Sequence, residues 1–210
     1  MDLTLAILSL LGTAVFAASG ALVAAEKRFD LIGAVFLSVA AGMGGGTIVD
    51  VLLGERVRWL DGPEPLWAAL FAAVVVFEAV RFGAPPEKSL VWADAAGLAL
   101  FTASGTQRLI ALGLDPAVTI FLTALGAAGG GIVRDMLANR APLVFSGEIY
   151  VTAALLGALS NYAVRSAGAN DAWALAAALL VTFLVRAVGI VFRVRLLPGG
   201  IKLPPDKGNT

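Results

Sequence analysis

Seven apolar segments, each close to the length that crosses a bilayer, dominate this 210-residue chain. A transmembrane helix needs about 20 mostly apolar residues. Hydrophobic residues make up 59% of the chain and charged residues 14%, whereas soluble domains hold about 45–50% apolar and about 25% charged residues. The sequence therefore predicts an all-α integral membrane protein with seven transmembrane helices, at residues 3–25, 31–53, 65–82, 90–112, 116–138, 148–166 and 172–193.

The connections between these segments are too short to form a second domain. We expect one transmembrane domain over residues 1–195, followed by a flexible tail at 196–210 that is rich in Pro, Gly and charged residues. Short cytoplasmic loops carry an excess of Lys and Arg. Fewer of these residues fall on the side of the N-terminus than on the other side, so we expect the N-terminus outside and the C-terminus in the cytoplasm.

The chain lacks the residues that most catalytic and metal sites use. It has no Cys and no His, which removes thiol chemistry and the commonest metal ligand. No HExxH, GxSxG or phosphate-loop motif is present. With 15 basic and 15 acidic residues, the net charge is zero. No strong electrostatic field therefore favours binding of nucleic acid. We expect no enzyme activity, no cofactor and no resident metal. An aspartyl dyad of Asp50 and Asp135 is the remaining enzymatic alternative.

The chain partly overlays itself when it is shifted so that Phe16 falls on Phe101, a displacement called here the repeat shift. The repeat shift spans three helices. Because three is odd, the second copy must be inverted in the membrane relative to the first. We expect three helices over 3–82, three inverted helices over 90–166, and a seventh helix at 172–193 outside the symmetry. Inverted repeats commonly build transport proteins whose sites lie where the two halves meet. The further matches include Ser19-Gly20, Asp30 and Asp50 with Ser104-Gly105, Asp115 and Asp135.

A glycine triplet lies inside each second helix of the two repeats. Each Gly costs about 1 kcal/mol relative to Ala in a helix interior, so a triplet is a point where a helix can kink or unwind. Freed backbone groups at this depth must face protein or water. We expect the triplets to turn backbone carbonyls toward a pathway, although close packing of small residues is an alternative. The triplets are Gly44, Gly45 and Gly46, and Gly129, Gly130 and Gly131.

Ionisable residues follow both triplets. Asp50, Arg134 and Asp135 lie within or near the ends of apolar segments, where charges face the bundle or water and have partners. Arg134 and Asp135 are neighbours that point in different directions on a helix. We expect an Arg134–Asp50 ion pair between the two repeats, either along a pathway or as a purely structural link.

Other polar residues have weaker assignments. Ser19, Ser104 and Thr47 are candidates for a polar path, or bond to carbonyls of their own helices. Glu78 and Arg81 are expected to form a helix-surface pair. Arg186 is expected to extend toward the cytoplasmic surface as an anchor.

These motifs resemble a known family. The two triplets, the run "GGGIVRD", two F-x-A-S-G runs and the inverted repeat resemble prokaryotic trimeric intracellular cation channels, whose sequence families overlap ones described as glycine transporters. The resemblance covers roughly residues 3–195. It departs at "GGGTIVD", where Val49 occupies the place of Arg134.

The resemblance implies a homotrimer in a bacterial or archaeal inner membrane, in contact with membrane lipids. It implies a potassium-conducting, hourglass-shaped pore in each subunit, lined by second and fifth helices that are kinked at the triplets. A secondary transporter of a small solute such as glycine is the alternative. Animal members bind acidic phosphoinositides, but the fifth segment here holds only Arg134, with Arg140 beyond it. That lipid regulation is therefore not expected.

Overall fold

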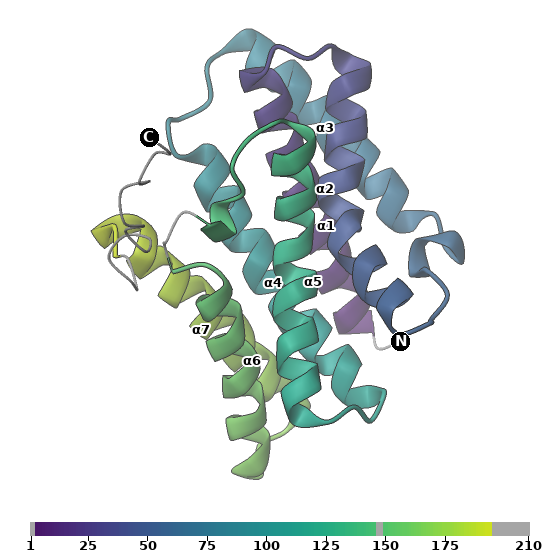
Figure 1. Cartoon of the computed structure of the whole chain (residues 1–210), viewed down its shortest axis with the longest axis vertical. Helices are drawn as coiled ribbons and strands as arrows, with labels where there is room; N and C mark the ends of the chain where they lie inside the picture. The colour runs from purple at the N-terminus through teal and green to yellow at the C-terminus, as the bar shows by residue number, and fades with distance from the viewer. Residues whose placement is uncertain (1–2, 146–148, 195–210) are drawn as a thin grey trace, which may run out of the picture.

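The computed structural model of the protein describes residues 3–145 and 149–194. These residues form seven α-helices and two short 3-10 helices, and no strand occurs among them (Figure 1). Every predicted segment except the sixth agrees with a helix to within one residue. The helices are α1 (Leu3–Glu26), α2 (Leu31–Leu52), η1 (Arg58–Leu60), α3 (Glu64–Phe82), α4 (Ser89–Ala111), α5 (Pro116–Leu137), η2 (Leu143–Phe145), α6 (Val151–Ser166) and α7 (Asp171–Phe192).

The sixth helix is shorter than predicted. It begins at Val151, whereas the predicted start at 148 lies outside the described residues, as does the predicted tail at 196–210. Five of the seven helices are long and apolar enough to span a membrane. The exceptions are α6, which has only 16 residues, and α4, whose buried face carries several polar residues.

The same local signal starts the second helix of each repeat. The Asp30 side chain accepts a hydrogen bond of 2.8 Å from the Gly33 backbone N–H, and Asp115 accepts one of 2.8 Å from Ala117. Such N-caps satisfy backbone donors that have no partner within the helix. Pro116 then occupies the first turn of α5, where its missing N–H removes no helical bond.

The helices repeat with the register that the sequence predicts. The repeat shift carries both ends of α2 onto those of α5, and both ends of η1 onto those of η2. Across the two repeats, α1 packs against α4 and α2 packs against α5, while α7 packs against α4 and α6. Figure 1 shows α6 and α7 side by side at the lower left, away from α3. The predicted arrangement of two inverted three-helix units and a seventh helix is confirmed.

The second glycine of each triplet lies where α2 crosses α5. A Cβ atom at Gly45 would collide with the carbonyl oxygen of Gly126, and one at Gly130 would collide with that of Ala41. These two contacts are equivalent under the repeat, because Ala41 corresponds to Gly126. As residue numbers rise along α2 they fall along α5, so the helices cross antiparallel. The glycines let the two backbones touch, as small residues do in membrane helix pairs.

The triplets do not unwind their helices. Helical structure continues from Leu31 to Leu52 and from Pro116 to Leu137 without interruption. Unwinding at the triplets is therefore excluded for this conformation, and the packing alternative accounts for the second glycine. The turning of carbonyls toward a pathway remains a prediction. A bend within each unbroken helix remains a prediction.

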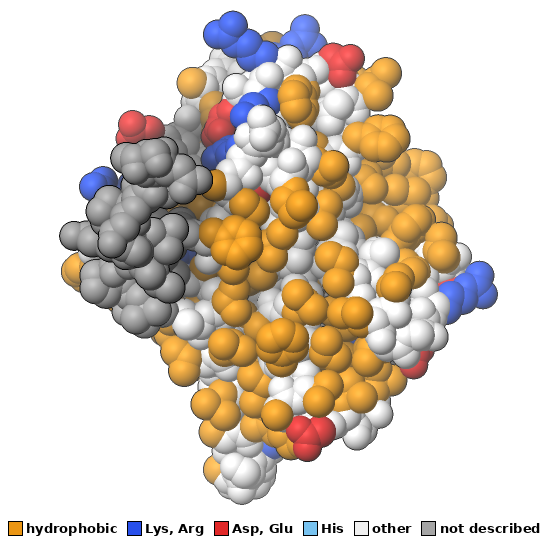
Figure 2. Space-filling view, viewed as in Figure 1, with side chains coloured by type: hydrophobic (Ala, Val, Ile, Leu, Met, Phe, Trp, Pro, Cys, Tyr) orange, Lys and Arg blue, Asp and Glu red, His pale blue; other side chains and the backbone are white. Residues whose placement is uncertain are grey.

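The outer surface is apolar in the way a lipid-facing surface requires. Large hydrophobic side chains cover much of the face in Figure 2, whereas Lys, Arg, Asp and Glu gather toward its margins. Exposed apolar residues occur on most of the helices, among them Phe36, Phe71, Phe121, Leu156 and Trp173. A patch of this extent on a soluble monomer would be unusual, so the surface supports insertion in a bilayer.

Candidate functional site

Two charged clusters lie on opposite sides of the crossing between α2 and α5. The first, called here the N-side layer, consists of Asp50, Arg58 and Arg108 and lies on the side where α1 begins. The Asp50 side chain is 1% exposed. It accepts hydrogen bonds of 3.2 Å from both the backbone N–H and Nε of Arg58 and pairs with Arg108 Nη1 at 2.8 Å. A carboxylate buried in this way needs such partners.

Three cavities adjoin the N-side layer, and Arg58 lines all of them. One of about 370 Å³ lies between α1, α2 and the start of α3 and reaches Gly46, Thr47 and Phe101. A second of about 420 Å³ is lined by Arg58, Arg108 and Arg165. A third of about 30 Å³ lies between α2, α4 and α5. Solvent-sized space therefore reaches into the protein from this side.

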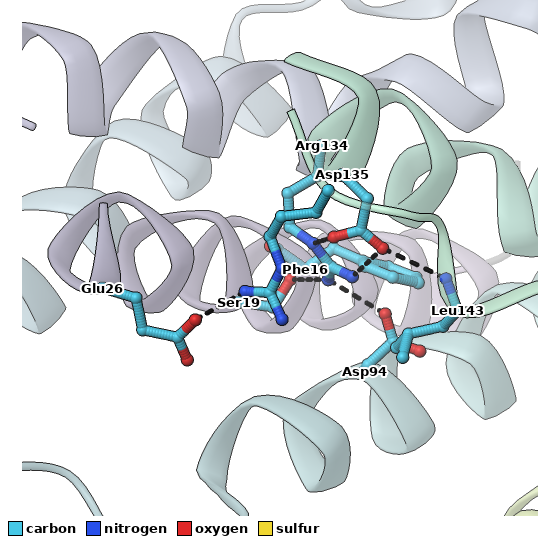
Figure 3. Close-up of polar contacts among 8 residues, drawn as sticks. Phe16, Ser19, Glu26, Asp94, Arg134, Asp135 and Leu143 are labelled. Atoms are coloured by element: carbon cyan, nitrogen blue, oxygen red, sulfur yellow. Dashed lines mark hydrogen bonds and ion pairs between the residues drawn. The ribbon is translucent and has the colours of Figure 1, made fainter. Parts of the chain in front are cut away.

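The second cluster, called here the C-side layer, consists of Ser19, Asp94, Arg134 and Asp135 (Figure 3). Arg134 is 0% exposed. Its Nη1 donates to Ser19 Oγ at 2.7 Å and to Asp94 Oδ1 at 2.9 Å. Its Nε and Nη2 donate to the two oxygens of Asp135 at 2.9 and 3.1 Å. One guanidinium group therefore joins α1, α4 and α5.

The planar guanidinium explains how a single cation can hold this cluster. Arg offers five N–H donors in a fixed fork, which suits two-point contact with a carboxylate. The fork engages Asp135 through two donors while another donor reaches Asp94. The buried Arg134 charge is thereby paired with carboxylates inside the protein.

The two layers share one motif that follows the repeat. Asp135 accepts a hydrogen bond of 3.3 Å from the backbone N–H of Leu143 at the start of η2, just as Asp50 accepts one of 3.2 Å from Arg58 at the start of η1. Each aspartate thus ties the end of its helix to the loop that follows. The arginines do not repeat, because Val49 stands in α2 where α5 has Arg134.

The third glycine of each triplet leaves space for charged side chains of these layers. A Cβ atom at Gly46 would lie 3.0 Å from Arg58 Nη2, and one at Gly131 would lie 3.1 Å from Asp94 Oδ1. The first glycine of α2 makes a looser contact, with Val133 at 3.5 Å from a Cβ at Gly44. The triplet therefore combines backbone contact at its middle with space for charged side chains at its end.

The expected Arg134–Asp50 ion pair is wrong. Arg134 pairs with Asp94 and Asp135, whereas Asp50 pairs with Arg58 and Arg108. The expectation that Arg134 and Asp135 point apart is also wrong, because the long Arg side chain folds back onto its neighbour. The antiparallel crossing places Asp50 and Arg134 on opposite sides of the glycine contact.

The hydroxyl groups bond to carbonyls of their own helices, as one of the two alternatives predicted, and they also contact other groups. Ser19 donates to the Phe16 carbonyl at 2.6 Å while accepting from Arg134. Ser104 donates to the Leu100 carbonyl at 2.9 Å and lines two of the cavities. Thr47 bonds to its own helix and also accepts from Trp59 Nε1 at 3.0 Å.

Of the two remaining predictions, one is confirmed and one is wrong. The exposed Glu78–Arg81 pair is confirmed, with oxygen–nitrogen distances of 2.9 and 3.0 Å. The assignment of Arg186 as a surface anchor is wrong. Its side chain is 0% exposed, donates to the Ile149 carbonyl at 3.1 Å, and lies over the Tyr150 ring at 5.1 Å.

Sequence reasoning missed several members of the layers. Asp94 lies in the apolar run "VWADAAGLAL", so the general rule that intramembrane charges have partners would have found it. Arg58 lies in the connection after the second predicted segment, and Arg108 lies near the end of the fourth. No sequence signal links them to Asp50, because η1 and the end of α4 meet α2 only in the folded protein.

The fold and the paired layers define a class: a membrane protein built from inverted repeats with ionisable groups where the repeats meet, as in channels and secondary transporters. Comparison with known proteins refines this class. The model of a family described as "Glycine transporter" matches residues 6–81 and again residues 91–166, which are the two repeats.

Curated relatives carry general names. A "UPF0126 membrane protein" from Deinococcus radiodurans is 42% identical over 154 residues, which is 72% of each chain. The "UPF0126 inner membrane protein YadS" from Escherichia coli strain K12 is 32% identical, over 90% of this chain and 93% of its own length.

Solved structures are more informative. The trimeric intracellular cation channel orthologue from Rhodobacter sphaeroides superposes with a TM-score of 0.87 at 38% identity, covering 91% of this chain and 99% of that one. Another prokaryotic channel of this type gives a TM-score of 0.85 at 32% identity, covering 92% and 98%. The chain belongs to the prokaryotic trimeric intracellular cation channel family, which overlaps the glycine transporter family model.

Proposed function

We propose that this chain forms a channel for monovalent cations, chiefly potassium, as a homotrimer with one ion path in each subunit. The observation that carries the proposal is the full-length similarity to the Rhodobacter sphaeroides cation channel, at 38% identity and a TM-score of 0.87. That protein is named as a trimeric cation channel. The similarity extends along the chain rather than over one motif, which supports transfer of both the activity and the assembly.

The proposed path runs from the cavities of the N-side layer past the glycine crossing to the C-side layer. Gly46, Thr47 and Asp50 line the cavity of about 370 Å³, and Ser104 lines the neighbouring ones. Oxygen atoms of carboxylates, hydroxyls and carbonyls can replace part of the hydration shell of a cation. The remaining predicted path residues are Ser19, Arg134 and Asp135 with the glycines of both triplets.

The proposed path is closed on the C side in this conformation. Arg134 and Asp94 are 0% exposed and Asp135 is 2% exposed, so bulk water does not reach the ion pairs that join α1, α4 and α5. An ion that crosses here must pass between these side chains. Conduction therefore requires the ion pairs of the C-side layer to separate.

Electrical recording tests the proposed function. Purified protein, shown to be trimeric by cross-linking, is placed in a planar bilayer with a KCl gradient. We expect a current that reverses near the potassium equilibrium potential and falls when a large organic cation replaces potassium. Absence of any cation current from an intact trimer would disprove the proposal.

A pair of charge variants gives this recording its internal control. Asp50→Asn removes a carboxylate from the proposed path and is expected to weaken the preference for cations over chloride. Glu78→Gln removes one from the exposed helix-surface pair on α3 and is expected to leave the preference unchanged. An equal preference for cations over chloride in the two variants would exclude Asp50 from the path.

A small-solute carrier is the second candidate, and one observation favours it. Three guanidinium groups, those of Arg58, Arg108 and Arg165, line the cavity of about 420 Å³ together with Asp171. Such a cavity suits a zwitterion, because guanidinium groups bind carboxylates and an aspartate can accept from an ammonium group. Uptake of labelled glycine into liposomes tests it: saturable uptake that Arg165→Gln weakens would support a carrier, and non-saturable or absent uptake would count against one.

We also propose an inner-membrane location with the N-terminus outside. Because the chain has no cysteine, single substitutions in exposed loops report the orientation directly. Asp61→Cys is expected to react with an impermeant thiol reagent added to whole spheroplasts, and Glu87→Cys only after lysis. The reverse pattern would invert the assignment.

A further inference from the structure

An aromatic pair lies between the two charged layers. The rings of Phe16 on α1 and Phe101 on α4 are stacked, with centroids 5.6 Å apart and planes at 24°. The two residues are equivalent under the repeat shift, so the stack lies where the repeats face each other. An offset stack of this kind is a favourable arrangement for two aromatic rings.

Each ring packs against a glycine of the opposite repeat. A Cβ atom at Gly97 would lie 2.7 Å from Cδ2 of Phe16, and one at Gly12 would lie 3.4 Å from Cδ2 of Phe101. Gly12 and Gly97 are themselves equivalent under the repeat. Because Gly12 and Gly97 have no side chains, both rings fit between α1 and α4. Each ring packs against one of these glycines.

The stack lies next to the cavities on one side and near residues of the C-side layer on the other. Phe101 lines both the cavity of about 370 Å³, which contains Asp50, and the small cavity next to Arg108. On the other side, the backbone carbonyl of Phe16 accepts from Ser19, whose hydroxyl accepts from Arg134. Figure 3 shows Phe16 beside Ser19 and Arg134. A route that leaves these cavities toward the C-side layer therefore begins beside Phe101.

We propose that the Phe16–Phe101 stack is an apolar permeation barrier between the two charged layers, and this rests on the proposed channel function. An ion that passes an apolar constriction loses water without gaining polar partners, and such constrictions gate channels by losing their own water. The barrier acts on hydrated monovalent cations. It is distinct from the ion pairs of the C-side layer, because it contains no charge and follows the repeat symmetry.

The chain supplies a matched control in a second pair of repeat-related phenylalanines. Phe36 and Phe121 are also related by the repeat shift, but they are 75% and 64% exposed on the outer surface. Substituting them changes the same side chain in the same helical repeat without touching the space between the layers.

Potassium currents of single trimers in planar bilayers test the barrier. Phe101→Ala is expected to raise the unitary conductance or the open probability several-fold, whereas Phe121→Ala leaves both unchanged. Phe101→Trp enlarges the ring and is expected to lower the current. The opposite sign of the two Phe101 variants separates a barrier from simple damage to folding, which would lower the current in both.

A chemical readout does not depend on how well the alanine variant folds. Phe101→Cys would be the only thiol in the chain, and a small cationic methanethiosulfonate reagent is expected to modify it and alter the current at once. The same reagent on Phe121→Cys is expected to have no effect on the current.

The outcomes distinguish failure of the barrier from failure of the channel. A conducting wild type with an unchanged Phe101→Ala current and an unreactive Phe101→Cys would overturn the barrier alone and leave the stack as core packing. A silent wild type with a conducting Phe101→Ala would support it. Silence in both, with trimers intact, would overturn the barrier and the proposed channel together.

Discussion

The two charged layers start from equivalent sequence positions but differ in their contact with water. In the N-side layer, Asp50 is buried while the Arg58 side chain is 40% exposed, and cavities lie beside it. In the C-side layer, Asp94, Arg134 and Asp135 are all buried. An inverted repeat can therefore reproduce the backbone and still place its charges in two different dielectric surroundings.

The difference has energetic consequences. Removing one partner of a buried ion pair leaves the other charge without compensation, at about 3–5 kcal/mol, whereas exposed pairs contribute about 0–1 kcal/mol. Stability should therefore depend strongly on the C-side layer and weakly on the outer arginine of the N-side layer.

Arg134→Ala should produce the largest loss of stability. It leaves Asp94 and Asp135 buried without their common cation, so we expect a loss of about 3–5 kcal/mol. Thermal unfolding of the detergent-purified protein, followed by size-exclusion chromatography, measures this loss. A melting curve close to that of wild type would show that water enters the C-side layer and screens the carboxylates.

The glycine crossing should be the next most sensitive feature. Gly45→Ala or Gly130→Ala places a methyl group against a carbonyl oxygen of the opposing helix, so we expect about 1–3 kcal/mol of destabilisation from overpacking. Gly105→Ala is the control, because its Cβ would lie 3.8 Å from Thr123 Cγ2, an ordinary contact. Equal melting temperatures for Gly45→Ala and Gly105→Ala would mean that α2 and α5 separate easily.

Arg58→Ala should have the smallest effect on stability. Its side chain is partly exposed, and Arg108 remains 2.8 Å from Asp50, so we expect a loss of about 1 kcal/mol or less. The same unfolding assay makes the comparison direct. A loss as large as that of Arg134→Ala would show that the two layers are energetically alike despite their different exposure.

Much of the fold was predictable because it depends on local or periodic signals. Apolar length located the helices. The repeat shift predicted the inverted repeat, which the helix bounds and the double family match confirm. The triplets and the run "GGGIVRD" carried the resemblance that predicted the cation channel family.

The partners of the charges were less predictable. Arg134 was expected to reach Asp50, but the antiparallel crossing separates them, and Asp94 on α4 takes that place. Arg186 was expected at the surface because it lies near the end of an apolar helix, yet it lies over Tyr150. A long side chain has several possible partners within reach, and only the packing of neighbouring helices selects among them.

Residue types and their spacing were enough to establish a seven-helix inverted repeat in a membrane, because hydrophobic length and repeat symmetry are properties of the chain alone. The ion pairs, the unbroken course of α2 and α5 through their glycines, and the Phe16–Phe101 stack depend on which helices touch and at what depth. Those contacts join residues that are far apart in sequence. Their energies come from burial and close approach, which exist only once the helices are packed.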